Sequence, residues 1–259
     1  MPRFAANLSM MFNEVPFLDR FALAAKAGFK AVEFLFPYDF PAAEIATRLK
    51  DNGLSQVLFN APPGDWTKGE RGMAALPGRQ GEFRDAIGKA LEYCAVLECP
   101  RLHVMAGLKP EGMAHDTMTA VYGANLAWAA EQCAKVGVKP IIEPINHRDI
   151  PGFFLNTTDQ AAAIIAAVGA DRLGMQFDLY HCQITEGDVV KRVEKHLPLI
   201  SHMQVADNPG RNEPGTGEVN WPFVFSRIDA LGFRGWIGCE YRPAGETTAG
   251  LGWFEPYKA

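Results

Sequence analysis

The sequence lacks the features of two large classes of protein. No apolar run in its 259 residues is long enough to span a bilayer, and no basic segment followed by an apolar one opens the chain. Lys and Arg number 25 against 30 Asp and Glu, and the resulting net charge of −5 is opposite in sign to a nucleic-acid-binding surface. We therefore expect neither a membrane nor a nucleic acid as partner.

The sequence also lacks cysteine pairs with metal-site spacing and motifs that bind nucleotides. The five cysteines are odd in number and lack the paired spacing of a zinc site, so we expect reduced thiols and a cytoplasmic protein. No P-loop, dinucleotide fingerprint or nucleophilic Ser or Cys elbow is present, and the segment Asn7–Met11 after the first predicted strand is not Gly-rich. We expect no organic cofactor.

What the sequence does contain is an alternation of short β-like runs with helical segments. Strands are predicted at residues 4–9, 31–35, 54–60, 102–106, 140–146, 173–179, 200–206 and 235–241. Helices are predicted at 16–28, 41–53, 82–97, 115–136, 158–168, 186–196 and 221–231. An open doubly wound sheet would carry a Gly-rich turn after its first strand. We therefore predict an α/β fold, a single (β/α)8 TIM barrel, with residues 1–259 as one domain.

The predicted loops are unequal in length. Helix-to-strand connections are tight, whereas strand-to-helix connections are long at residues 60–80, 146–157 and 207–220. Compact domains keep loops short unless the loops have a function. The long loops follow the carboxyl ends of the strands, and this is the face of a TIM barrel that carries the active site.

Four apolar runs in the second half each end near a residue that can bind a metal, namely Glu143, Asp178, Gln204 and Glu240. A lone Glu at a strand end is more often a surface or ion-paired residue. However, Glu143 shares a strand face with Ile141 and Ile145, so it points toward the core. Several buried carboxylates would repel one another unless a cation compensated them. We therefore predict a metal site, and its all-oxygen ligands favour Mg2+ or Mn2+.

Neighbouring residues extend the predicted site. We interpret His181 as a neutral hydrogen-bonding group for a substrate oxygen and Arg211 as a clamp for an anionic substrate. Their alternatives are a solvated loop histidine and a solvated arginine. Gly238, on the same strand face as Glu240, is expected to leave room inside the barrel for a ligand. Trp66, Lys68 and Arg71 lie in the long third loop.

Two glutamates on opposite walls of a metal pocket suit proton transfer beside a carbonyl. A metal can hold the carbonyl oxygen and its neighbouring hydroxyl, while one of Glu143 and Glu240 removes a C–H proton and the other returns one. The product is an isomer or an epimer. The expected partner is a small hydroxy-oxo acid, and a homo-oligomer is possible.

At these residues the sequence resembles xylose-isomerase-like barrels and, within them, the hydroxypyruvate isomerase family. The resemblance covers nearly the whole chain through AVEFLFPYDF from Ala31, GDWTKGERG from Gly64, EPINHRDIPGFFL from Glu143 and QVADNPGRNEPGTGEVNW from Gln204. It implies an intramolecular oxidoreductase that interconverts hydroxypyruvate and tartronate semialdehyde. It also implies Glu143 and Glu240 as the proton-transfer pair, and Glu143, Asp178, Gln204 and Glu240 as metal ligands. Related ketose 3-epimerases usually have a histidine where this chain has Gln204.

Three alternatives stay open from the sequence: a 2-oxo-tetronate isomerase, a ketose 3-epimerase, and a non-catalytic sugar-acid-binding barrel with a structural metal. A role in nucleic-acid repair would need a His-rich zinc cluster and a basic groove.

Overall fold

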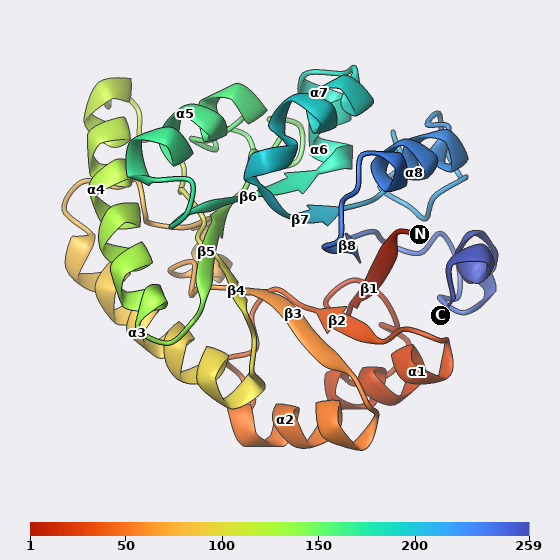
Figure 1. Cartoon of the computed structure of the whole chain (residues 1–259). Helices are drawn as coiled ribbons and strands as arrows, with labels where there is room; N and C mark the ends of the chain where they lie inside the picture. The colour runs from red at the N-terminus through yellow and green to blue at the C-terminus, as the bar shows by residue number, and fades with distance from the viewer. Residues whose placement is uncertain (259) are drawn as a thin grey trace.

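Eight parallel strands form a closed barrel in the computed structural model, which describes residues 1–258 (Figure 1). Each strand pairs with the next in sequence, and β1 pairs with β8, so no strand edge remains open. The strands are β1 (Arg3–Asn7), β2 (Ala31–Glu33), β3 (Ser55–Asn60), β4 (Arg101–His103), β5 (Lys139–Ile142), β6 (Gly174–Asp178), β7 (Ile200–Gln204) and β8 (Trp236–Cys239). The predicted TIM barrel is confirmed.

Helices surround the barrel (Figure 1). They are α1 (Arg20–Lys26), α2 (Ala42–Asp51), α3 (Gln80–Leu97), α4 (His115–Ala134), α5 (Thr158–Val168), α6 (Leu179–Thr185), α7 (Val189–His196) and α8 (Trp221–Ala230). Short 3-10 helices lie at Phe17–Asp19, Trp66–Lys68, Leu197–Leu199 and Ala249–Tyr257. In α3, for example, Phe83, Ile87, Ala90 and Cys94 recur at helical spacing and are buried.

The strands are buried on both faces, because the helices cover the outside and side chains fill the inside. All five residues of β6 are buried, as are all three of β2. This double burial explains why the strands read as almost continuous apolar runs rather than as alternating patterns. A polar residue within such a run therefore faces the protein interior.

Two of the differences from the prediction affect the carboxyl ends of the strands. The strands end earlier than expected at their carboxyl ends, so Glu143 and Glu240 lie one residue beyond β5 and β8. The chain also forms α6 directly after β6, where only a loop was expected. Among residues 1–258, no helix is long and apolar enough to cross a membrane.

Candidate active site

Every strand brings a polar side chain to the same rim of the barrel. These residues lie at the last position of the strand or directly after it: Asn7, Glu33, Asn60, His103, Glu143, Asp178, Gln204 and Glu240. All of them are buried. The sequence prediction identified the last four and missed Glu33, although Glu33 ends the apolar run of β2 in the same manner.

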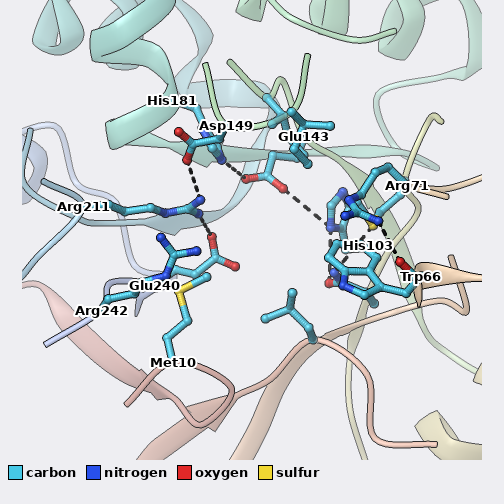
Figure 2. Close-up of a pocket in the computed structure, with 15 residues that line it drawn as sticks. Met10, Trp66, Arg71, His103, Glu143, Asp149, His181, Arg211, Glu240 and Arg242 are labelled. Carbon is cyan, nitrogen blue, oxygen red and sulfur yellow. Dashed lines mark hydrogen bonds and ion pairs between the residues drawn. The ribbon is translucent and has the colours of Figure 1, made fainter. Parts of the chain in front are cut away.

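Three of the rim residues form a compact cluster with His181 of α6. One ligand atom from each of Glu143, Asp178, His181 and Glu240 lies within 4.8 Å of the others. The chain thus gathers three carboxylates from the carboxyl ends of β5, β6 and β8 and one imidazole from α6. Figure 2 shows Glu143, His181 and Glu240 around one cavity.

The two oxygens of Asp178 have different environments. Oδ1 accepts hydrogen bonds from the backbone N–H groups of Tyr180 (2.7 Å) and His181 (3.3 Å), and it thereby caps the N-terminus of α6. Oδ2 is buried and has no hydrogen-bond partner in the described part of the chain. The cap therefore fixes the carboxylate so that one oxygen remains available to a ligand.

Crowding of these carboxylates disfavours their charged forms. Burial, together with the charges of Glu240 and Asp178, raises the pKa of Glu143 well above its ordinary value. Burial raises the pKa of Asp178 to about 6. It also raises the pKa of Glu240 to about 8, although the neighbouring Arg211 opposes this rise. A bound divalent cation would reverse these shifts, because it favours the ionised form of each carboxylate.

The donor set fits such a cation. Glu143 Oε1, like Asp178 Oδ2, is buried without a hydrogen-bond partner in the described residues. Buried oxygens left without a donor are costly, and a hard cation would satisfy them. The cluster could therefore hold a metal ion.

Gln204 belongs to a different set of contacts. Its Oε1 accepts a hydrogen bond from Gln176 Nε2 (2.5 Å), and its Nε2 donates to Glu33 Oε1 (2.9 Å). It lies beside Asp178 in the register of β6 and β7. Because the amide oxygen already accepts one hydrogen bond, its role as a metal ligand stays a prediction.

Glu33 is the centre of a buried polar layer that we call the barrel floor, formed by Asn7, Glu33, Gln176, His202 and Gln204. Its Oε1 also accepts from Asn7 Nδ2 (2.9 Å), and its Oε2 lies 2.6 Å from His202 Nε2. A Cβ atom on Gly238 would come within 2.1 Å of Glu33 Oε2. The prediction that Gly238 leaves room for a ligand was therefore wrong: the Glu33 carboxylate occupies that space.

His181 lies in the first turn of α6 rather than in a loop. Asn146 Nδ2 lies 2.5 Å from His181 Nδ1, and Asn146 Oδ1 accepts from the backbone N–H of Asp149, which fixes the amide orientation. Because burial lowers the pKa of His181 well below its ordinary value, the ring is neutral. Its Nδ1 accepts from Asn146, so Nε2 carries the proton. Nε2 lies 3.6 Å from Asp178 Oδ2 and 3.8 Å from Glu143 Oε1.

Arg211 lies at the same cavity but is already paired. It donates to Glu240 Oε2 (2.5 Å) and Asp149 Oδ2 (2.7 Å), and its guanidinium lies between these carboxylates in Figure 2. Its guanidinium carbon also lies 5.0 Å from the ring centre of Tyr180. Sequence reasoning missed Asp149, which is 62 positions from Arg211 and carries no strand signal.

The cavity above the cluster has a volume of about 330 Å3. Trp66 and Arg71 of the third loop line it, whereas Lys68 is exposed and pairs with Asp65. His103 also lines it: its Nδ1 lies 3.2 Å from Asn60 Oδ1 and 3.6 Å from Glu143 Oε2. Burial lowers the pKa of His103 to about 3, so this imidazole is neutral too.

The closed barrel and the buried carboxylate cluster at its rim define a TIM barrel with a candidate metal-binding active site. The chain belongs to the xylose isomerase-like TIM barrel family, whose model matches residues 21–257.

Full-length relatives extend this assignment. The chain is 58% identical to a 2-oxo-tetronate isomerase of Cupriavidus necator, with 99% of each chain covered. It is 45% identical to a hydroxypyruvate isomerase of Escherichia coli, with 100% of each covered. A crystal structure described as an AP endonuclease, family 2, from Brucella melitensis is 50% identical, covers 100% of each chain and superposes with a TM-score of 0.98. The relatives from C. necator and E. coli are both named isomerases, and this chain is an isomerase.

Proposed function

We propose that this isomerase moves a carbonyl group between C2 and C3 of a short 2-oxo acid, with hydroxypyruvate and tartronate semialdehyde as its interconverted pair. A 2-oxo-tetronate is the second candidate substrate, because the relative from C. necator bears that name at 58% identity. The two reactions make the same bonds, since a 2-oxo-tetronate differs from hydroxypyruvate by one hydroxymethyl group on C3.

The observation that carries this proposal is the placement of Glu143 and Glu240. One carboxylate oxygen of Glu143 and one of Glu240 lie within 4.8 Å of each other in a buried cluster, although the two residues follow β5 and β8, which are not neighbours in the barrel. One carboxylate could take a proton from C3 of the substrate while the other gives a proton to C2, and the hydroxyl proton passes from the C3 oxygen to the C2 oxygen, so that the carbonyl moves from C2 to C3. Such a transfer needs C2 and C3 of the substrate to lie between the two side chains.

The other residues have complementary roles. A divalent cation held by Glu143, Asp178 and Glu240, with Gln204 as the further predicted ligand, would supply Lewis-acid polarisation of the substrate oxygens; Mg2+ or Mn2+ suits this oxygen-rich set. The proton on His181 Nε2 can be donated to an oxygen of the substrate, whose charge increases when the C–H proton leaves. Arg211 positions Glu240 by a direct hydrogen bond, and Asp149 holds Arg211.

A repair nuclease is less consistent with the site. The cluster contains a single histidine among three carboxylates, and the chain has a net charge of −5. Binding of a DNA backbone would require clustered cationic side chains. An incision assay on a duplex with an abasic site provides the direct comparison, and we expect no cleavage.

The test is an NMR assay in heavy water with hydroxypyruvate and with 2-oxo-tetronate, each with Mg2+ or Mn2+ and then with a chelator. We expect the isomeric product and deuterium incorporation at the carbon that receives the proton. The substrate with the higher kcat/KM is the preferred one. Binding of both acids without exchange of a C–H proton would reject the enzyme and support the sugar-acid-binding barrel.

A further inference from the structure

The proposed substrates share a carboxylate on C2, one of the two reacting carbons, and this anion needs a cationic partner in the cavity. Three arginines line the cavity: Arg71, Arg211 and Arg242. Arg211 is neutralised by Glu240 and Asp149, so its charge is already balanced. The other two arginines are therefore the candidates for binding the substrate carboxylate.

Arg71 and Arg242 differ in burial. Neither has a carboxylate partner within ion-pair distance among residues 1–258, but Arg242 is exposed to solvent and Arg71 is half-buried. A partly desolvated guanidinium binds an anion more strongly than an exposed one, because less water screens the pair. Figure 2 shows Arg71 beside Trp66 and His103, across the cavity from Arg211 and Arg242.

The side chain of Arg71 is held in one orientation. Its guanidinium carbon lies 3.8 Å from the ring centre of Trp66, which is the geometry of a cation–π contact. Nη1 donates to the backbone carbonyls of Glu70 (2.7 Å) and Trp66 (3.1 Å). Nε and Nη2 have no hydrogen-bond partner in the described chain, and these two groups form the edge that pairs side-on with a carboxylate.

The backbone around Arg71 is also fixed. The next residue, Gly72, donates its N–H to Pro63 O (2.9 Å) and forms an isolated antiparallel bridge with Ala106. A Cβ atom at Gly72 would come within 2.4 Å of Met105 O, so only glycine permits this close approach. The loop is thereby packed against the segment that follows β4, and the guanidinium has a defined place on the cavity wall.

We propose that Arg71 binds the carboxylate of the substrate through its Nε–Nη2 edge, with Trp66 as its positioning residue, and so selects 2-oxo acids over neutral sugars. This inference rests on the proposed function, because it assigns a residue to the anionic group of that substrate class. It differs from the prediction that Arg211 is the anion clamp.

The test uses Arg71→Met and Arg71→Lys, with Arg242→Met as the matched control from the same cavity. With the 2-oxo acid that the wild type turns over, we expect Arg71→Met to lower kcat/KM by about 10- to 100-fold, mainly through KM. Arg71→Lys keeps the positive charge but lacks the paired Nε and Nη2 donors of the guanidinium, so its kcat/KM should fall less than that of Arg71→Met. Arg242→Met should change kcat/KM less than about threefold. The Tm of each variant shows whether it is folded.

Ligand binding separates this inference from the proposed function. Glycerate resembles hydroxypyruvate and tartronate semialdehyde but has no carbonyl group beside its hydroxyl groups that could be moved, so it binds without reacting. Glyceramide has the same carbon skeleton with a neutral amide in place of the carboxylate. By NMR titration with Mg2+ present, we expect the wild type to prefer glycerate and Arg71→Met to lose that preference. An undiminished preference in Arg71→Met, or an equal loss in Arg242→Met, would overturn the assignment. Absence of turnover in the wild type would reject the proposed function, while the titration still decides the role of Arg71.

Discussion

Gly238 and Glu33 are in direct contact at the centre of the barrel: a Cβ at Gly238 would lie 2.1 Å from Glu33 Oε2. The carboxylate cannot move aside easily, because Asn7, His202 and Gln204 hold its two oxygens. We therefore expect Gly238→Ala to lower the free energy of unfolding by about 1–3 kcal/mol, as overpacked cores do. Urea denaturation measures this loss.

The matched control for that substitution is Gly88→Ala in the exposed face of α3, where no atom lies within 4 Å of the added methyl group. Alanine favours a helix over glycine by roughly 1 kcal/mol, so this variant should be as stable as the wild type or more stable. If the Gly238→Ala variant were as stable as the wild type, the Glu33 carboxylate would be able to move away from the added methyl group, and the predicted overpacking would be incorrect.

Glu143→Gln and Glu240→Gln should each lower kcat by about 10²- to 10⁴-fold, because an amide cannot accept and return the proton. The two substitutions preserve side-chain shape, so circular dichroism should remain unchanged. Glu218→Gln, on the exposed part of the β7–α8 loop, is the control and should retain wild-type turnover. If either active-site variant stays within tenfold of the wild type, the two-glutamate transfer is incorrect.

Metal binding can be measured apart from activity. We expect Mg2+ or Mn2+ to raise the Tm of the wild type after treatment with a chelator, since a ligand at about 100 times its Kd adds about 2.7 kcal/mol of stability. Asp178→Asn keeps the Oδ1 cap of α6 and removes the charge at Oδ2. This variant should fold with little or no rise in Tm on metal addition. A rise as large as that of the wild type would place the cation elsewhere.

The proton on His181 can be moved by one substitution. In Asn146→Asp, a carboxylate faces Nδ1 and favours the tautomer that carries its proton there, which removes the donor at Nε2. Loss of one hydrogen bond to a charged group corresponds to about 1.5–3 kcal/mol, so we expect kcat to fall roughly 10- to 100-fold.

Nitrogen-15 NMR of the imidazole reports the tautomer of His181 directly. Asn146→Ser removes the amide donor without adding a charge and serves as the comparison. A change of tautomer in Asn146→Asp without any loss of turnover would exclude His181 as a hydrogen-bond donor in the reaction.

The barrel itself could be predicted from the sequence because each unit repeats a strong local pattern. Apolar runs separated by about one strand-plus-helix length predict parallel strands, and strand ends in such a fold meet at one rim. That reasoning was sufficient to select Glu143, Asp178 and Glu240. It did not require knowledge of any contact between distant segments.

The remaining features depend on contacts that no local pattern encodes. Helix α6 begins without a linker, because the side chain of Asp178 itself supplies the cap. Glu33 could have been found from the run Ala31–Glu33, but its bonds to His202 and Gln204 join residues about 170 positions apart. The pairing of Arg211 with Asp149 is equally non-local, and sequence reasoning, which predicted Arg211 as a clamp for an anionic substrate, did not anticipate it.

The interlocked amides, imidazole and carboxylate of the barrel floor also restrict how this scaffold can be redesigned. Asn7, Gln204 and His202 each satisfy Glu33, so exchanging one of them leaves another buried group without its partner. Changes of substrate are better sought in the surrounding loops, where the side chains that meet the ligand belong to separate segments. Redesign of the substrate specificity would therefore keep the residues of the barrel floor unchanged and vary the loops that line the cavity.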